Sequence, residues 1–207
     1  MLKLHGKGRT RWVKPYWVLR ELDLSFEAIT AGPLSAETQT PAFLALNPLA
    51  KVPVLEDDGQ AVFESSAICA YLADKHHDRK RLIPEPGTLA RARHDQWVSV
   101  AVTELEQPLW RIARHTFVYP EAKRSAAEIE LARGDFRATL KRIAPFLERE
   151  TLLESFTVAD VTMAYTLRWG SSPAVPAYAD LLDDAPAARA YLERQCARPA
   201  FPRELYA

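Results

Sequence analysis

The sequence of 207 residues predicts an α/β N-terminal domain followed by an all-α C-terminal domain. Segments with strand and helix patterns follow one another in the order β-α-β-α-β-β-α through the first part of the chain. Residues 79–87 are charged and then rich in proline, which is typical of a linker, and every later segment has helical spacing. The expected domains therefore cover residues 1–78 and 88–207.

The first four elements follow from hydrophobic spacing. Strand patterns cover residues 2–5 and 25–29, and helical patterns cover residues 13–22 and 42–46. The first strand, helix and second strand form a unit in which two parallel strands are joined by a crossover helix. Pro15 fits only the first turn of a helix and disfavours helical angles at Lys14, so we expect the first helix to begin near Lys14–Pro15.

The chain is organised around residues 51–66, KVPVLEDDGQAVFESS. Residues 52–55 read as a strand, Asp58-Gly59 is a strong hairpin signal, and residues 60–63 read as the returning strand. Hydroxyl side chains at Ser65 and Ser66 are candidate N-caps for an apolar helix that follows. Pro53 removes a ladder donor, so it must lie at a sheet edge or follow a cis bond.

These residue types describe a site for a small zwitterionic peptide. A cis bond before Pro53 turns the backbone groups of Val52 outward, where an extended peptide can pair with them. Glu64 and Ser65 place a carboxylate and a hydroxyl at a helix N-terminus, whose N–H groups favour an anion. The peptide's carboxylate would bind at the helix end and its ammonium at Glu64. An ordinary corner between a hairpin and a helix would contain the same residue types.

Composition excludes several classes of protein. Lys plus Arg and Asp plus Glu both number 27 without long blocks of one sign, so we expect neither nucleic-acid nor membrane binding. No apolar run is long enough to span a bilayer. Cys69 and Cys196 lack metal-ligand spacing, so no metal is expected, and Cys69 has the surroundings of an inert core thiol. We expect a soluble protein of a reducing compartment, the cytoplasm.

The C-terminal part has two long helical patterns, 89–110 (interrupted by Pro108 and extended toward 115) and 121–149. Thr157 and Asp160 then form a capping-box signature, with Phe156 and Val161 placed to close a hydrophobic staple. Two shorter helices end near residue 198.

The motif KVPVLEDDG with the following Glu64-Ser65 step resembles the glutathione-binding half of the cytosolic glutathione transferase superfamily, of a bacterial, beta-like or related class. The Thr-Val-Ala-Asp step at residues 157–160 resembles the N-cap of the buried helix in that family's C-terminal domain. The resemblance extends over nearly the whole chain. It implies a thioredoxin-like N-terminal domain in which Val52-Pro53 is the cis-proline corner and Glu64-Ser65 binds the γ-glutamyl end of glutathione.

The resemblance also implies how sulfur is activated. Thr10 lies at the family's serine position, where a hydroxyl donates a hydrogen bond that stabilises the nucleophilic thiolate. The threonine methyl restricts the rotamer, so we expect Arg11, with Arg9 second, to supply positive charge beside Thr10. Thr10 as a simple turn residue is the alternative.

Further contacts to glutathione are implied by position. Lys51 is placed to pair with the glycyl carboxylate, and Gln39 falls roughly where related bacterial enzymes carry a lysine for the same group. Ser99 and Thr103 share one helix face and match positions that reach across a homodimer to the partner's glutathione. Glu106 stands where the family has a histidine. Ser99 and Thr103 as plain surface hydroxyls is the alternative.

The function implied is that of a glutathione S-transferase for detoxification, which adds the thiolate of glutathione to a small, largely hydrophobic electrophile. Trp12, Trp110 and Arg111 are the expected lining of the second-substrate pocket. The sequence leaves conjugation, peroxide reduction, dehalogenation and isomerisation open. The alternatives are a non-catalytic glutathione- or ligand-binding protein and a transferase-like module that binds another protein.

Overall fold

A computed structural model describes residues 1–206, which form two compact units. The first comprises Met1–Pro84 together with the segment that begins at Arg198, and the second comprises Glu85–Ala197. The break after Pro84 falls inside the linker expected at residues 79–87. The segment from Arg198, which the sequence pattern placed with the helical domain, instead packs in the first unit because Arg198 pairs with Glu21 there.

The first unit is built on a four-stranded mixed sheet with the order β2-β1-β3-β4. Strands β1 and β2 are parallel, whereas β1 with β3 and β3 with β4 are antiparallel. The bounds are Leu2–His5 for β1, Glu27–Ile29 for β2, Val54–Asp57 for β3 and Gln60–Phe63 for β4. With helices α1 (Val13–Glu21), α2 (Pro41–Leu46) and α3 (Ser65–Lys75), this confirms the predicted α/β order and the thioredoxin-like fold.

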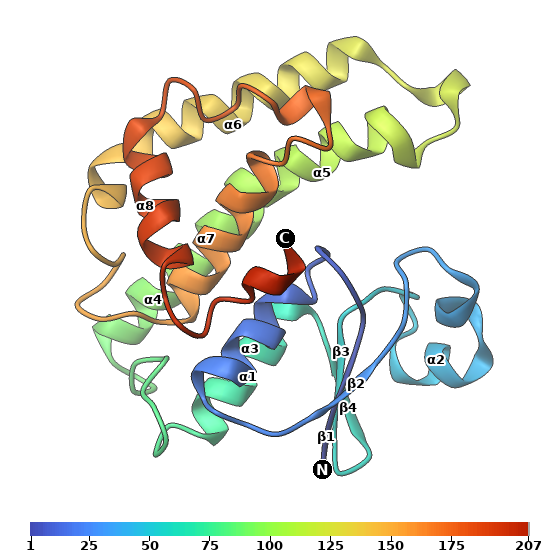
Figure 1. Cartoon of the computed structure of the whole chain (residues 1–207), viewed down its shortest axis with the longest axis vertical. Coiled ribbons are helices and arrows are strands. Elements are labelled where there is room, and N and C mark those ends of the chain that lie inside the picture. The colour runs from blue at the N-terminus through green and yellow to red at the C-terminus, as the bar shows by residue number, and fades with distance from the viewer. Residues whose placement is uncertain (207) are drawn as a thin grey trace. The chain divides into compact units, whose positions relative to one another are not determined.

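Helices cover both faces of this sheet, with α1 and α3 side by side on one face and α2 on the other (Figure 1). Leu4 and Leu55 are opposite each other in the register and fully buried. Because side chains alternate along a strand, the next pair, His5 and Val54, faces α2, where both lie near Phe43.

The hairpin between β3 and β4 is the one the sequence predicts. Asp58 and Gly59 both have positive φ, at 48° and 82°, as a two-residue type I′ turn requires. The Val52–Pro53 bond is cis, as expected. The strand begins at Val54 rather than Val52, because Pro53 has no N–H to contribute to the ladder.

Helix α1 begins at Val13, with Trp12 at the N-cap. Lys14 is the second helical residue, so the expectation that Pro15 excludes Lys14 from helical angles is wrong. The N–H groups of the first helical turn have no acceptor within the helix, so the missing N–H of Pro15 at the third position costs no bond.

The second unit is all-helical. Its helices are α4 (Leu89–Val100), α5 (Gln107–Ala113), α6 (Ala126–Leu147), α7 (Val158–Gly170) and α8 (Pro186–Cys196). π-Helical segments at Ala101–Glu106 and Arg114–Val118 flank α5, and 3₁₀ turns lie at Ala36–Gln39, Glu121–Lys123, Pro176–Tyr178 and Arg203–Leu205. Helix α6 begins later than residue 121 because Ser125 caps it, its hydroxyl accepting from the N–H of Glu128.

Pro108 explains the first π-helical segment. Gln107 donates its N–H to the carbonyl of Val102, five residues back, and Pro108 opens α5 with no N–H of its own. The wider turn lets the chain continue past a proline that would otherwise clash with a preceding carbonyl. The long segment predicted at 89–110 is therefore one continuous but irregular path.

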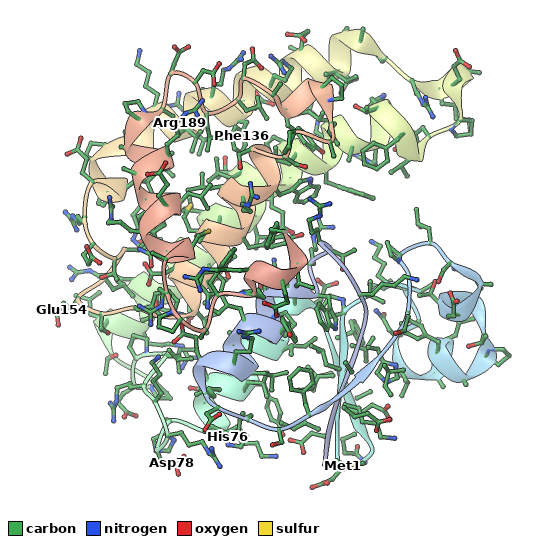
Figure 2. The ribbon with its side chains drawn as sticks, viewed as in Figure 1. Met1, His76, Asp78, Phe136, Glu154 and Arg189 are labelled. Atoms are coloured by element: carbon green, nitrogen blue, oxygen red, sulfur yellow. The ribbon has the colours of Figure 1, made fainter. Side chains whose placement is uncertain are left out.

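Helix α7 is the core of the second unit and is buried along nearly its whole length. Asp160 accepts the N–H of Thr157 at 2.8 Å, which confirms the predicted capping box. At the other end a Cβ on Gly170 would lie 2.9 Å from the ring of Phe136, so only glycine permits this approach of α6. The buried ring of Phe136 is labelled in Figure 2.

A helix that crosses a bilayer needs about 20 consecutive, mainly apolar residues. Within residues 1–206, no helix has both the length and the apolar character needed to cross a membrane.

Candidate functional site

Three loops meet at one end of the sheet in the first unit. The register places His5, Val54 and Phe63 in one row, so β1 ends where β3 begins and β4 ends. Directly beyond this row lie the loop 6–12, the Val52–Pro53 corner and the Glu64–Ser65 step. The sequence-predicted residues Thr10, Arg11, Val52, Pro53, Glu64 and Ser65 therefore occur at the same edge.

The N-terminus of α3 lies at this sheet edge and has no side-chain cap. Glu64 occupies the N-cap position without a capping hydrogen bond from its side chain. The hydroxyl cap expected from Ser65 or Ser66 is therefore wrong, since both residues lie within the helix. The first N–H groups of a helix have no intrahelical acceptor, and the helix dipole adds partial positive charge. Ser65 is buried beside them and Glu64 is exposed.

The backbone of Glu64 is strained. Its φ of 70° and ψ of 114° lie outside the regions that residues with a Cβ prefer. Such conformations cost about 1–3 kcal/mol and persist where the surrounding structure enforces them, often at binding sites. The strained residue brings its own carboxylate and the first N–H groups of α3 to the same short corner.

A polar cluster fixes the other end of α3 against the sheet. Tyr71 donates to Oδ2 of Asp57 at 2.6 Å, and Lys75 pairs with the same oxygen. The hydrogen bonds from Lys75 and then Tyr71 hold the pKa of Asp57 below its usual range. The bond to Asp57 likewise raises the pKa of Tyr71. Helix α3 is thereby held in place on β3.

The hydroxyl of Thr10 holds the loop before α1. It donates to the carbonyl of Lys7 at 3.1 Å and accepts from the N–H of Trp12 at 3.4 Å. To donate a hydrogen bond to the sulfur atom of a ligand, the Thr10 hydroxyl must first give up its hydrogen bond to the Lys7 carbonyl. Arg11 is half-buried and Arg9 is exposed in the same loop.

Trp12 covers the end of β1. Gly6 has a φ of 143°, and a Cβ there would lie 2.3 Å from Cδ1 of Trp12, so the indole requires glycine at this position. The Trp12 ring stacks on Tyr16 with centroids 4.4 Å apart. Its Nε1 is buried and, within the described residues, has no hydrogen-bond partner.

Asn47 is a site-supporting residue that sequence reasoning did not assign. Its Nδ2 donates to the carbonyl of Lys51 at 2.7 Å, and its Oδ1 accepts from the N–H of Leu49. These bonds hold the chain that leads into Val52. The signal was an asparagine before Pro48 in a short connection, which favours side-chain bonds to the backbone. Lys51 itself is exposed, as is Gln39 in the turn before α2.

The remaining predicted residues belong to the second unit. Ser99 and Thr103 are exposed, and each hydroxyl donates to the carbonyl four residues earlier. Trp110 is half-buried on α5. Their relation to the sheet edge of the first unit stays a prediction.

Arg111 has partners within its own unit. Its guanidinium donates to Asp135 at 2.8 Å and to Glu128 at 3.0 Å, both on α6. The hydrogen bond to Glu128, followed by that to Asp135, raises the pKa of Arg111. The prediction that Arg111 lines a substrate pocket gains no support from these contacts, because they join α5 to α6.

Cys69 belongs to the core of the first unit. Cys69 is fully buried in α3, and burial raises the pKa of its thiol to about 12, which confirms an inert core residue. Among residues 1–206, no group of three His, Cys, Asp or Glu side chains is arranged to hold a metal ion.

Comparison with known proteins agrees with this geometry. The family model "Glutathione S-transferase, N-terminal domain" matches residues 2–74. The chain is 28% identical over 211 residues to glutathione S-transferase F13 of Arabidopsis thaliana, covering 97% of this chain and 93% of that one. It is also 34% identical over 137 residues to human elongation factor 1-gamma, covering 63% of this chain and 29% of that protein.

A solved structure resembles the chain over almost its full length. The glutathione transferase URE2P6 of Phanerochaete chrysosporium, in complex with oxidized glutathione, aligns with a TM-score of 0.84 and 25% identity. The alignment covers 99% of this chain and 94% of that one.

Proposed function

Since this chain belongs to the cytosolic glutathione transferase superfamily, we propose that it binds glutathione at the sheet edge of its first unit and activates the thiol for attack on a small electrophile. The observation that carries the proposal is the uncapped N-terminus of α3, which lies beyond the same sheet row as Val52 and the Thr10 loop. A similar protein has been crystallised with oxidized glutathione.

The proposed binding mode uses backbone and side-chain groups in turn. The γ-glutamyl carboxylate accepts hydrogen bonds from Ser65 and the first N–H groups of α3, and Glu64 takes the ammonium. Val52 lies outside the sheet ladder, which begins at Val54, and its backbone pairs with the cysteinyl residue. Lys51 pairs with the glycyl carboxylate, and Gln39 donates a hydrogen bond to the same group.

The proposed chemistry is the loss of one proton and the formation of one bond. The thiol of glutathione gives up its proton to water, and the thiolate forms a bond to an electrophilic atom. At the same time that atom's bond to a leaving group, or its π bond to a neighbouring atom, breaks, and the leaving group or neighbour takes the electron pair. Thr10 donates a hydrogen bond to sulfur after releasing the Lys7 carbonyl, and Arg11, with Arg9 second, supplies positive charge. The reaction type stays open.

The proposed assembly is a cytoplasmic homodimer that serves detoxification. Ser99 and Thr103 are exposed on the row of α4 and its π-helical extension that would face the partner. Trp12 is the proposed apolar contact of the electrophile in the first unit, and a contact of Trp110 with the electrophile stays a prediction. Arg111 joins α5 to α6 within the second unit.

Calorimetry with reduced glutathione tests the binding site. Ser65→Ala should weaken affinity about ten- to a hundredfold, because a bond to a charged group is worth about 1.5–3 kcal/mol. Ser66→Ala, which removes the neighbouring hydroxyl, is the matched control and should bind like wild type. Equal affinity in both variants, or no binding by wild type, would reject the assignment.

A second candidate is a module that binds another protein. Two observations favour it: the similarity to elongation factor 1-gamma, and the Thr10 hydroxyl, whose hydrogen is already bound to the Lys7 carbonyl. This candidate predicts no turnover with a panel of electrophiles. It also predicts that Thr10 variants leave the pKa of the glutathione thiol unchanged. Measured turnover that depends on glutathione rejects it.

A further inference from the structure

The segment that begins at Arg198 runs along α1 from the end of the helix toward its start. Arg198 pairs with Glu21, and the ring of Phe201 meets the ring of Trp17 edge to face, with centroids 5.0 Å apart. Between these two contacts the segment advances three residues and the contact on α1 moves four residues, about one turn, toward the helix start. The segment therefore lies on α1 in a fixed register.

Glu204 makes the contact nearest the start of α1. Its Oε1 accepts from the hydroxyl of Tyr16 at 2.9 Å and from Nη1 of Arg20 at 2.5 Å. One carboxylate thus joins two residues on successive turns of the helix. The 3₁₀ turn Arg203–Leu205 contains Glu204, and Tyr206 after it stacks on Phe201 at 5.5 Å, which anchors the turn.

Tyr16 transmits this restraint to the loop before α1. Its ring stacks on Trp12 with an interplanar angle of 18° and a centroid distance of 4.4 Å. The backbone N–H of Trp12 in turn donates to the hydroxyl of Thr10. A continuous path of contacts therefore leads from Glu204 through Tyr16 and Trp12 to the Thr10 hydroxyl.

We propose that Glu204 and Tyr16 are positioning residues for thiol activation. They hold the Trp12 ring in one orientation, and Trp12 holds the Thr10 hydroxyl where it meets sulfur. The proposal rests on the proposed function, in which glutathione binds beside Thr10. Neither residue lies among the groups that bind glutathione in that account, so their effect should fall on the thiol and not on affinity.

Two conservative variants test the path. Tyr16→Phe keeps the ring stack and removes the hydroxyl, and Glu204→Gln keeps an acceptor and removes the charge that pairs with Arg20. Glu193→Gln, an exposed carboxylate on α8, is the matched control. The readout is the pH titration of thiolate absorbance for bound glutathione. We expect both test variants to raise the apparent pKa of the thiol by about half to one pH unit. The dissociation constant, measured at a pH well below that pKa so that bound glutathione is protonated, should change less than about twofold.

A second measurement needs no ligand. Hydrogen exchange followed by mass spectrometry reports opening of the loop 6–12, which we expect to be several times faster in both test variants than in wild type and control. Faster exchange with an unchanged thiol pKa would reduce the two residues to a structural role and overturn the proposal. Unchanged exchange would overturn the path itself. If wild type fails to bind glutathione, the proposed function fails, whereas exchange still decides whether Glu204 and Tyr16 hold the loop.

Discussion

Nε and Nη2 of Arg198 donate hydrogen bonds to the two carboxylate oxygens of Glu21, over 2.8 and 3.1 Å. The same carboxylate accepts from Nε1 of Trp17 at 3.2 Å and pairs with Lys80. Glu21 is buried at the end of α1, so the pairing joins α1, the connection at Lys80 and the segment from Arg198 within the first unit.

This arrangement predicts a pH-dependent loss of stability. Burial opposes ionisation, but hydrogen bonds from Arg198 and Lys80 outweigh it and hold the pKa of Glu21 below its usual range. A depressed pKa contributes stability above the unfolded value, about 4.3, and that stability is lost as pH falls through the folded pKa. Glu21→Gln should lower the free energy of unfolding by about 1.5–3 kcal/mol at pH 7.

Urea unfolding of wild type and Glu21→Gln between pH 7 and pH 3 measures this. The difference between their free energies of unfolding should shrink as the pH approaches 3. A constant difference across the range would show that Glu21 is not held ionised by its partners.

Glu64 should lower the stability of the fold through its strained backbone and strengthen glutathione binding through its carboxylate. Glycine accepts positive φ without strain, so Glu64→Gly should raise the free energy of unfolding by about 1 kcal/mol while abolishing the ammonium contact. Glu64→Ala keeps the Cβ and the strain and is the matched control, which should weaken binding without stabilising the fold. Thermal unfolding and calorimetry with glutathione measure both quantities. Full affinity in either variant would contradict the role of the carboxylate.

The capping residue of α7 should be essential for the second unit. Asp160 is fully buried and accepts hydrogen bonds from the N–H groups of Leu152 and Thr157 and from the hydroxyl of Tyr191 at 2.6 Å. Asp160→Ala leaves these donors unsatisfied and should cost about 3–5 kcal/mol. Tyr191→Phe removes one bond to the carboxylate and should cost about 1.5–3 kcal/mol. Denaturant unfolding measures the loss of stability in both variants. Equal losses would contradict the central role of the Asp160 carboxylate.

Dimer formation is the prediction that concerns Ser99 and Thr103. We expect the mass of two chains by light scattering at micromolar concentration, through an isologous interface. Thr103→Arg should shift the equilibrium toward the monomer, while Glu193→Arg on α8 should not. A monomeric wild type would exclude any contact of these hydroxyls with a partner's glutathione.

The sequence predicted those parts of the fold that local chemistry determines. Strand β1, the Asp58-Gly59 turn, the cis bond before Pro53 and the capping of α7 by Asp160 each follow from a few adjacent residues. The sheet edge that gathers Thr10, Val52 and Glu64 followed from a family resemblance more than from spacing.

The rest depends on contacts between distant residues. The pairing of Arg198 with Glu21 joins positions 177 residues apart, and no local sequence pattern predicts it. The carboxylates that hold Arg111 lie on a different helix, so the sequence around Arg111 did not indicate a residue that joins two helices. Helix α3 lacks the hydroxyl cap that Ser65 suggested, because the strained backbone of Glu64 starts the helix one residue earlier than a serine cap would.

The most direct test of the central claim is the pH titration of thiolate absorbance for glutathione bound to wild type, Thr10→Val and Thr10→Ser. The account predicts a bound thiol with an apparent pKa well below the free value of about 8.5, raised toward that value in Thr10→Val and largely kept in Thr10→Ser. Arg11→Gln should raise it in part. A thiol that titrates at the free value in wild type, or one that ignores all three substitutions, would contradict the claim that this loop activates glutathione.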